Sequence, residues 1–387
     1  MFSHRVPPGL APNRIATELA NAAPRFDLTV TNPTLCGIPY PSGLLDALAD
    51  PAGLVYHPHP RGVQAAREAV AGECARHGVV VDPGRIVLTA STSEAYALLF
   101  KLLADPGESV LIPSPSYPLF EHLAHVEGVQ AVPYHLSPEL GWRPDFHELA
   151  AAPPGVRAVI VVHPNNPTGS LVDPDDAAEL AELAAARGWA IIADEVFLDY
   201  PLGGGLGAGR TFAATDRALT FTLGGLSKSV GLPQLKLAWM IASGPEELLK
   251  DALERLEFIA DTFLSVATPV QLALPRVLRQ GAAVRSAILE RCRFNLAALR
   301  EAATRVPAVA APEPAAGWSA TVRIPAFVAE EEFVLELLRS DGVAVHPGYF
   351  FDFPSEGTLV LSLLPDPTTF AQGVDRLLAR VGTHLSV

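Results

Sequence analysis

The stretch Leu223-Gly-Gly-Leu-Ser-Lys-Ser-Val-Gly-Leu-Pro, residues 223–233, follows an apolar run at residues 218–223. Such a run is typical of a buried strand, and the small residues after it indicate a loop at the end of that strand. Lys228 is therefore expected on a rigid element in partly desolvated surroundings, which an amine that forms an imine requires. Taken alone, Lys228 could equally be a surface loop lysine, so other segments have to decide between the two.

The segment at residues 85–105 predicts a short strand, a turn and a helix in succession. Apolar residues 86–88 form the strand, Thr89-Ala-Ser-Thr-Ser is a hydroxyl-rich turn, and apolar residues then recur at helical spacing. The free N–H groups and the positive dipole end of a helix bind anions, and the hydroxyls of Ser91 and Thr92 add donors. The turn therefore predicts a phosphate site, with an ordinary N-cap at Ser93 as the alternative.

Three further predicted strands end in polar or aromatic side chains. Asn166 follows the apolar run at residues 158–162, in a turn with two prolines and a glycine. Asp194 ends another apolar run and needs a cation or hydrogen-bond donors, because burial otherwise raises the pKa of a carboxyl group. Tyr117 follows the strand predicted at residues 109–112, where its ring either stacks on a flat heterocycle or packs in the core.

Taken in chain order, these segments resemble the fold-type I pyridoxal-phosphate aminotransferases of class I/II over nearly the whole chain. The resemblance implies that Lys228 forms the Schiff base with pyridoxal 5'-phosphate and that Asp194 pairs with the pyridine nitrogen. It also implies that Asn166 hydrogen-bonds the ring oxygen, that Tyr117 stacks on the ring, and that the phosphate is held by Ala90, Ser91, Thr92 and Ser227. In such a set the lysine, once free, is a base beside the substrate carbon.

Two more cofactor contacts follow from the resemblance. Lys236 stands where the family usually has an arginine on the phosphate, and a lysine keeps the charge but loses the bidentate geometry. Tyr56 looks like the family tyrosine that reaches the phosphate of the neighbouring subunit. It implies a homodimer with shared active sites.

The expected substrate side departs from the family pattern. Val360, in Leu359-Val-Leu-Ser, stands where most members carry the arginine that grips the substrate carboxylate. If that arginine is missing, another side chain binds the substrate carboxylate, or the substrate has no carboxylate beside its amine. Phe197 replaces the tyrosine that usually donates a phenol to the ring oxygen. Trp318 is expected either to wall the substrate pocket or to lie in the core.

Arg323 is the first candidate to replace the missing arginine. The strand predicted at residues 317–324 contains it and is expected beside the strand of Val360. A structural pairing of Arg323 with Glu332 or Asp341 is the alternative. Arg61, which the resemblance places in the other subunit, is the next candidate for the carboxylate, and Arg14 is the third.

The alternation of apolar strands and helical patterns between residues 51 and 244 predicts an α/β fold. We expect a large domain with a mainly parallel sheet of the seven-stranded type sandwiched by helices, and a smaller α+β domain. The expected boundaries are an N-terminal arm at residues 1–45 that joins the small domain, the cofactor-binding domain at 46–275 and the small domain at 276–387. Ligands bind at the carboxyl ends of parallel strands, where all these motifs lie.

Composition agrees with a cytoplasmic enzyme. The 387 residues are 49% hydrophobic, enough for two cores, and the formal charge of -14 argues against nucleic acid or an anionic membrane as a partner. No signal peptide or membrane-spanning stretch is recognisable. The three cysteines are expected to be reduced packing residues. The spacing of the histidines fits no metal site, so we expect them to lie in loops and face solvent: His57, His59, His163 and His346.

We therefore expect an aminotransferase (EC 2.6.1.-) that acts on an amino acid or related amine and a 2-oxo acid. A carbon–sulfur or other beta lyase, a decarboxylase or a racemase would use the same cofactor residues, because substrate orientation chooses the bond that breaks. A ligand-sensing module derived from this fold is the non-enzymatic alternative, although no basic DNA-binding segment precedes the domain.

Overall fold

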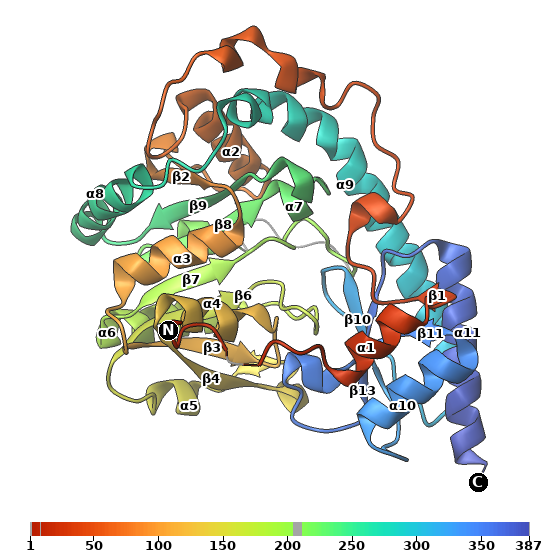
Figure 1. Ribbon diagram of the computed structural model, residues 1–387. Helices are drawn as coiled ribbons and strands as arrows, with labels where there is room; N and C mark the ends of the chain where they lie inside the picture. The colour runs from red at the N-terminus through yellow and green to blue at the C-terminus, as the bar shows by residue number, and fades with distance from the viewer. Residues whose placement is uncertain (1, 8, 204–210, 387) are drawn as a thin grey trace.

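The computed structural model describes residues 2–7, 9–203 and 211–386 (Figure 1). Its largest sheet has eight strands in the order β2-β9-β8-β7-β6-β3-β4-β5. These strands are β2 (Ile86–Thr89), β3 (Ser109–Ser114), β4 (Gln130–Ser137), β5 (Arg143–Pro144), β6 (Val156–Val162), β7 (Ala190–Asp194), β8 (Thr220–Gly225) and β9 (Ala238–Ser243). β9 and the two-residue edge strand β5 are antiparallel to their neighbours, and the other strands share one direction. The prediction of a mainly parallel sheet is confirmed.

Helices cover both faces of this sheet, which explains why its strands are apolar at successive positions rather than at alternate ones. In β6, Ala158, Ile160 and Val162 face one core, which also contains side chains of α3 (Thr92–Leu103), α4 (Leu119–Glu127) and α8 (Glu246–Asp261). Val159 and Val161 face the opposite core with α6 (Pro174–Arg187), and α5 (Phe146–Ala150) lies nearby. The sheet therefore forms the middle layer, as Figure 1 shows.

A second, smaller unit follows in the chain. Its sheet has the order β10-β13-β12, all antiparallel, and the parallel pair β1-β11 lies beside it. Its elements are β1 (Phe26–Asp27), β10 (Ser319–Arg323), β11 (Val343–Ala344), β12 (His346–Pro347), β13 (Thr358–Ser362), α10 (Glu330–Glu336) and α11 (Pro367–Leu385). The early segment that contains α1 (Arg14–Asn21) crosses to this unit, where Arg14 pairs with Glu331 and Glu332 of α10 (Figure 1).

Helix α9 (Thr268–Ala303) connects the two units as one long element. The boundary expected between residues 275 and 276 falls inside it, at Pro275. α9 also packs against α2 (Gln64–Arg76) and α11, so the same helix contacts elements of both units. The two units are therefore joined by one continuous helix that packs against both of them.

The burial of the cysteines agrees with the sequence prediction, whereas the burial of two histidines does not. Cys36, Cys74 and Cys292 are free and buried, as expected of packing residues. Two histidines contradict the prediction of solvent-facing loops: His163 is buried against the Phe212 ring, and His346 is half-buried. Within the described part of the chain, no helix is both long enough and apolar enough to cross a membrane.

Candidate active site

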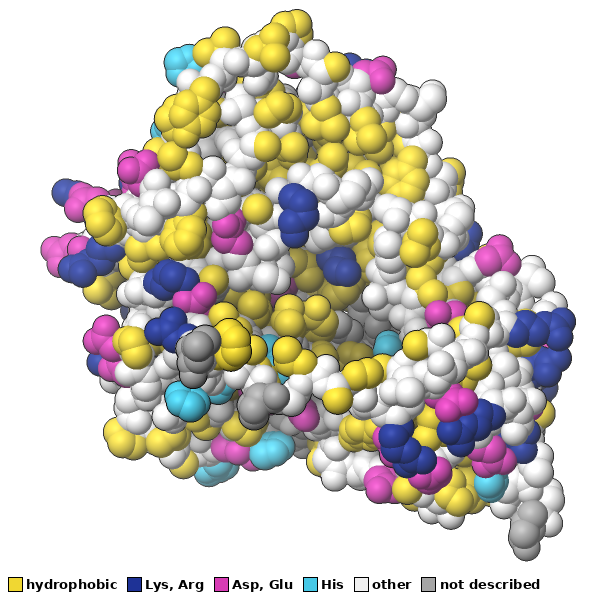
Figure 2. Space-filling view, viewed as in Figure 1, with side chains coloured by type: hydrophobic (Ala, Val, Ile, Leu, Met, Phe, Trp, Pro, Cys, Tyr) yellow, Lys and Arg dark blue, Asp and Glu magenta, His cyan; other side chains and the backbone are white. Residues whose placement is uncertain are grey.

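A cavity of about 540 Å³ opens where the carboxyl ends of the parallel strands meet the small unit. This volume lies in the roughly 300–1,000 Å³ range typical of small-molecule sites. The predicted site residues that line it are Thr92, Tyr117, Asn166, Asp194, Ser227, Lys228 and Trp318. Figure 2 shows this side of the molecule, which is hollowed between the two units. The structure thus brings most of the predicted cofactor residues into one place.

Lys228 lies in α7 (Leu226–Ser229), the short helix directly after β8. Its backbone is held from two sides. The Tyr200 hydroxyl donates to the Lys228 carbonyl, and Arg285 of α9 donates its Nε–H to the Ser229 carbonyl at 2.8 Å. A Cβ on Gly281 of α9 would lie 2.5 Å from Val230, so only glycine allows this close approach of α9 to the turn. The lysine therefore projects from a fixed backbone.

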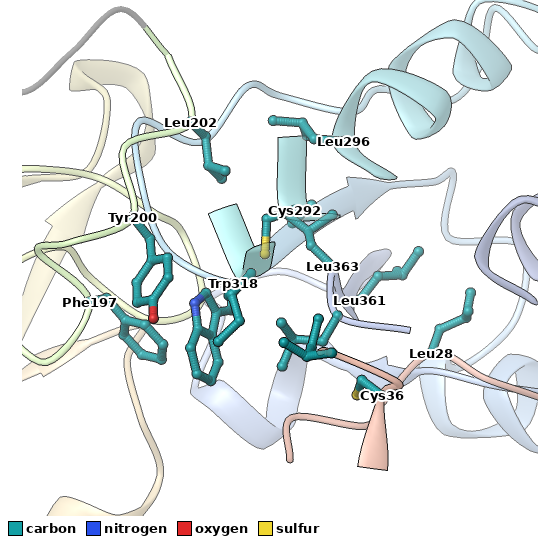
Figure 3. Close-up of a cluster of buried hydrophobic side chains, with 14 of the residues drawn as sticks. Leu28, Cys36, Phe197, Tyr200, Leu202, Cys292, Leu296, Trp318, Leu361 and Leu363 are labelled. Carbon is teal, nitrogen blue, oxygen red and sulfur yellow. The ribbon is translucent and has the colours of Figure 1, made fainter. Parts of the chain in front are cut away.

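Aromatic rings surround the Lys228 amine. Nζ lies 5.4 Å from the Phe197 ring centroid and 4.9 Å from that of Trp318. Figure 3 shows these rings beside Tyr200, whose ring contacts that of Trp318. Burial among them lowers the pKa of Lys228 to about 8, against the weaker attraction of Asp194. Trp318 is 1% exposed, so it is at once a cavity wall and a core residue.

Asp194 is buried at the end of β7, and its carboxylate accepts two hydrogen bonds. Tyr96 Oη donates to Oδ2 at 3.0 Å, and the Val196 N–H donates to Oδ1 at 3.2 Å. Burial nevertheless raises the pKa of Asp194 to about 6, because these bonds and the Lys228 charge offset only part of the lost hydration. The cavity thus holds an acid and an amine whose pKa values have moved toward one another.

The predicted phosphate turn lies at the start of α3. Ser91 is the N-cap, and its Oγ accepts from the Glu94 N–H at 3.1 Å. Thr92 and Ser93 line the cavity, but Ala90 does not; its N–H donates to the Glu94 carboxylate at 2.6 Å. The N-cap is therefore Ser91 and not Ser93, while Thr92 and Ser93 face the cavity.

Three predicted residues beyond the phosphate turn also lie outside this cavity within the single chain: Tyr56 and Lys236 on the cofactor side, and Arg61 on the substrate side. Tyr56 is 73% exposed and lines a separate small cavity near His57 and His59. Lys236 is exposed, in a left-handed backbone conformation after the Lys228 turn. The Arg61 guanidinium donates to the Gly84 carbonyl at 2.9 Å and pairs with Glu257 at 2.6 Å.

The expectation for Arg323 needs correction. Strand β10 pairs with β13 as predicted, with Thr321 opposite Val360, and Val360 lines the cavity of Lys228. Arg323, however, lines a different cavity of about 720 Å³ together with Thr321, and its side chain is exposed. Ser319 and Arg323 share a face of the strand, but four residues separate them by about 13 Å. The alternative partners are excluded too, because Glu332 pairs with Arg14 and Asp341 with Arg380.

Several residues that shape the cavity were not singled out from the sequence. Tyr96 is the side-chain donor to Asp194, although the sequence indicated no role for it beyond the predicted helix. Its position one turn into the helix after the hydroxyl-rich turn is the signal that could have indicated it. The others lie mainly in the small unit and the N-terminal segment, far away in sequence: Asn13, Thr29, Thr31, Ser319, His346, Phe350, Phe351 and Ser362.

The fold and this site define a pyridoxal-phosphate type of enzyme scaffold, and comparison with known proteins gives the family. Residues 45–377 match the family model of aminotransferase class I and II, so the chain belongs to that family. It is an aminotransferase, and the names of its relatives favour this activity over the beta lyase or decarboxylase alternative.

Two curated relatives illustrate the similarity. A glutamate-pyruvate aminotransferase from Haemophilus influenzae is 26% identical over 90% of this chain and 89% of its own length. An alanine aminotransferase from Mycobacterium tuberculosis is 28% identical over 82% of this chain and 76% of its own length. Among solved structures, a Thermus thermophilus aspartate aminotransferase double mutant superposes with a TM-score of 0.85 at 23% identity, covering 98% of this chain and 99% of the other. The fold is thus shared throughout.

Proposed function

We propose that the cavity binds pyridoxal 5'-phosphate at Lys228 and that the chain transfers an amino group between an amino acid or related amine and a 2-oxo acid. The observation that carries this proposal is the pairing of an amine of lowered pKa with a buried carboxylate in one cavity of about 540 Å³. Perturbed groups of opposite type that face a common cavity are typical of catalytic sites.

The chemistry of the donor set fits this cofactor. Lys228 supplies the primary amine for its aldehyde, and Asp194 a carboxylate for its protonated ring nitrogen. The start of α3 with Thr92, and the Ser227 hydroxyl, suit a phosphate dianion. Asn166 and Tyr117 complete the set with an amide for the ring oxygen and an aromatic face. Each chemical feature of the cofactor therefore has a matching side chain.

The roles of these side chains follow from their surroundings. The bound cofactor supplies an electron sink for the carbon that loses a proton. Because its pKa is near 8, Lys228 Nζ is partly unprotonated at neutral pH and, when free, can accept a proton from the substrate carbon and return it. Asp194, whose carboxylate accepts a hydrogen bond from Tyr96, would keep the ring nitrogen of the bound cofactor protonated. The Phe197 and Trp318 rings exclude water from Nζ.

A half-reaction assay tests this function. The holoprotein is mixed with L-alanine or L-glutamate, the first donors to try given the names of the relatives, and with uncharged primary amines. The expected result is loss of the visible absorption of bound cofactor, formation of pyridoxamine phosphate and its reversal by a carbonyl acceptor. A beta lyase would instead release pyruvate and ammonia, without pyridoxamine phosphate, from a donor with a leaving group on its beta carbon, so L-cysteine, which would lose hydrogen sulfide, is included to detect it.

We also propose that the enzyme is a homodimer with shared active sites. Exposed apolar side chains gather in two segments, with Leu54 90%, Tyr56 73%, Phe258 78% and Phe263 51% exposed. Burial of such groups against a second copy would be favourable and would carry Tyr56 toward the partner's cavity.

Subunit mixing tests the shared sites. Lys228→Ala and Tyr56→Ala homodimers should each be impaired. Refolded mixtures should regain up to about one quarter of wild-type activity, because half of the dimers are hybrids with one intact site of two. A mixture no more active than the mean of its parents would contradict shared sites, and monomers by light scattering would contradict the dimer.

A further inference from the structure

The cavity around Lys228 has few charged side chains on its walls. Among the described residues that line it, Lys228 and Asp194 carry the formal charges, and none is an arginine. The remaining lining residues are apolar, aromatic, hydroxyl, amide or imidazole side chains. The wall that this chain itself presents to an anionic group of a substrate is therefore nearly neutral.

The wall contributed by the small unit is built around Val360. This residue is 2% exposed, lines the cavity from the middle strand β13, and lies opposite Thr321 of β10 and His346 of β12. Ser362, two residues further along the same face of β13, also lines the cavity. A branched apolar side chain thus occupies the centre of the sheet that faces the substrate.

The other lining groups of this wall are neutral as well. Phe350 and Phe351 add aromatic surface, and Ser319 adds a hydroxyl. The His346 imidazole is the one titratable group on this wall among the described residues. It packs against the Phe350 and Phe351 rings, and burial lowers its pKa although Asp27 opposes the shift. The imidazole is therefore neutral at physiological pH.

The nearest candidate arginines are committed elsewhere. Arg61 pairs with Glu257, and Arg14 with Glu331 and Glu332. Arg323 faces the second cavity. A carboxylate that entered the first cavity would lose hydration, and among the described residues of this chain no arginine lines that cavity to pair with it. Burying an anion without a counter-ion is strongly unfavourable.

We infer that the preferred donor is a primary amine without a carboxylate on the reacting carbon, whose substituent is uncharged and mainly apolar. This inference rests on the proposed aminotransferase function and narrows it. The donor's C–N bond is exchanged for a C=O bond, the nitrogen passes to the acceptor carbonyl, and the acceptor becomes an amine, so the pair balances without an added oxidant. A 2-oxo acid acceptor uses the same cavity and is expected to bind weakly, with an aldehyde or ketone acting at lower concentration.

Matched donors that differ only in the carboxylate test the inference. The holoenzyme is mixed with L-phenylalanine or 2-phenylethylamine, L-leucine or 3-methylbutylamine, and L-alanine or ethylamine, and the second-order rate constant for loss of the visible band is measured. The expected result is a rate constant at least tenfold higher for the amine in the preferred pair. A Val360→Arg variant should reverse this preference, whereas Val360→Met, which adds length without charge, should not.

The outcomes separate two kinds of failure. If the amino acids react faster than their matched amines, the substrate class is wrong and the aminotransferase function stands. If neither kind of donor converts the cofactor, the proposed function fails and the substrate class with it. The comparison uses wild-type protein, so it decides the inference even if Val360→Arg does not fold, which its visible spectrum and melting temperature would reveal.

Discussion

Replacing Asp194 with asparagine should stabilise the cofactor-free protein while it removes most of the catalytic activity. The reason is that Asp194 is held in a buried position where its charge is costly without a cationic ligand. Burial raises the pKa of Asp194 from 3.8 to about 6 in the folded chain. Asparagine has almost the same shape and no charge to bury.

The magnitude follows from proton linkage. Each pKa unit corresponds to about 1.4 kcal/mol, so a shift of about two units makes the ionised Asp194 side chain destabilising by about 3 kcal/mol. The folded protein keeps this proton to higher pH than the unfolded chain does, so the free energy of unfolding falls between about pH 4 and 6. The full penalty applies above that window, and about half of it remains at pH 5.

Local contacts reduce the expected gain. Asparagine can still accept the Val196 N–H, and the Tyr96 hydroxyl can rotate to accept from its amide. Lys228 loses an attractive neighbour, but this matters little at pH 9, which is above the pKa of about 8 for its amine. We therefore expect a net stabilisation of about 1–3 kcal/mol at pH 9.

Urea denaturation of cofactor-free wild type and Asp194→Asn at pH 5 and pH 9 measures this difference. Asp216→Asn, at an exposed aspartate, controls for the change in net charge. In the holoenzyme, the same Asp194→Asn substitution should lower turnover at least 100-fold, because asparagine cannot hold the ring nitrogen proton as a carboxylate does. A variant that is no more stable than wild type at pH 9, or whose advantage is as large at pH 5, would refute the reasoning.

Three further predictions concern the lysine and its neighbours. Lys228→Ala should still bind pyridoxal phosphate but lose turnover by several orders of magnitude in a steady-state assay; a near-normal rate would show that another group does its work. The rate at which cofactor-free wild type attaches pyridoxal phosphate, followed by absorbance, should rise with pH and level off above about 8, the pKa of the Lys228 amine, since only the unprotonated amine reacts. A rate that is flat from pH 6 to 9 would contradict this. Phe197→Tyr adds a phenol that can stabilise an anionic ring oxygen, so the visible band should titrate at lower pH than in wild type, and an equal or higher value would count against it.

The large sheet and the cofactor side of the site were accessible from the sequence because both depend on local patterns. Strands that are buried on both faces are continuous apolar runs, as in β6 and β7, and parallel strands place their carboxyl ends at one edge. Asp194 ends one such run, and Lys228 lies in the short helix directly after another. A correct strand assignment therefore already brings the two residues together. Little knowledge of long-range packing was needed.

The substrate side was not accessible in the same way, because it depends on how far along each strand a residue lies. Alternation places Ser319, Thr321 and Arg323 on one face of β10, but the cavity of Lys228 ends near Ser319 and a second cavity begins at Thr321. No periodicity in the chain marks that division. It is set by where the small unit meets the end of the large sheet, a contact between segments far apart in the chain, such as Ser319 with Asn166.

Val360 remains informative about the substrate although Arg323 does not replace the arginine that is missing at this position. A missing arginine can be compensated only by a cation that reaches the same cavity, and the arginines suggested by the sequence are placed or paired elsewhere. The small unit then presents valine, serine and phenylalanine side chains to the cavity, together with His346, whose pKa is lowered by burial. Because a cavity of this kind favours neutral groups over anions, the departure at Val360 points to a different substrate rather than to a displaced anchor.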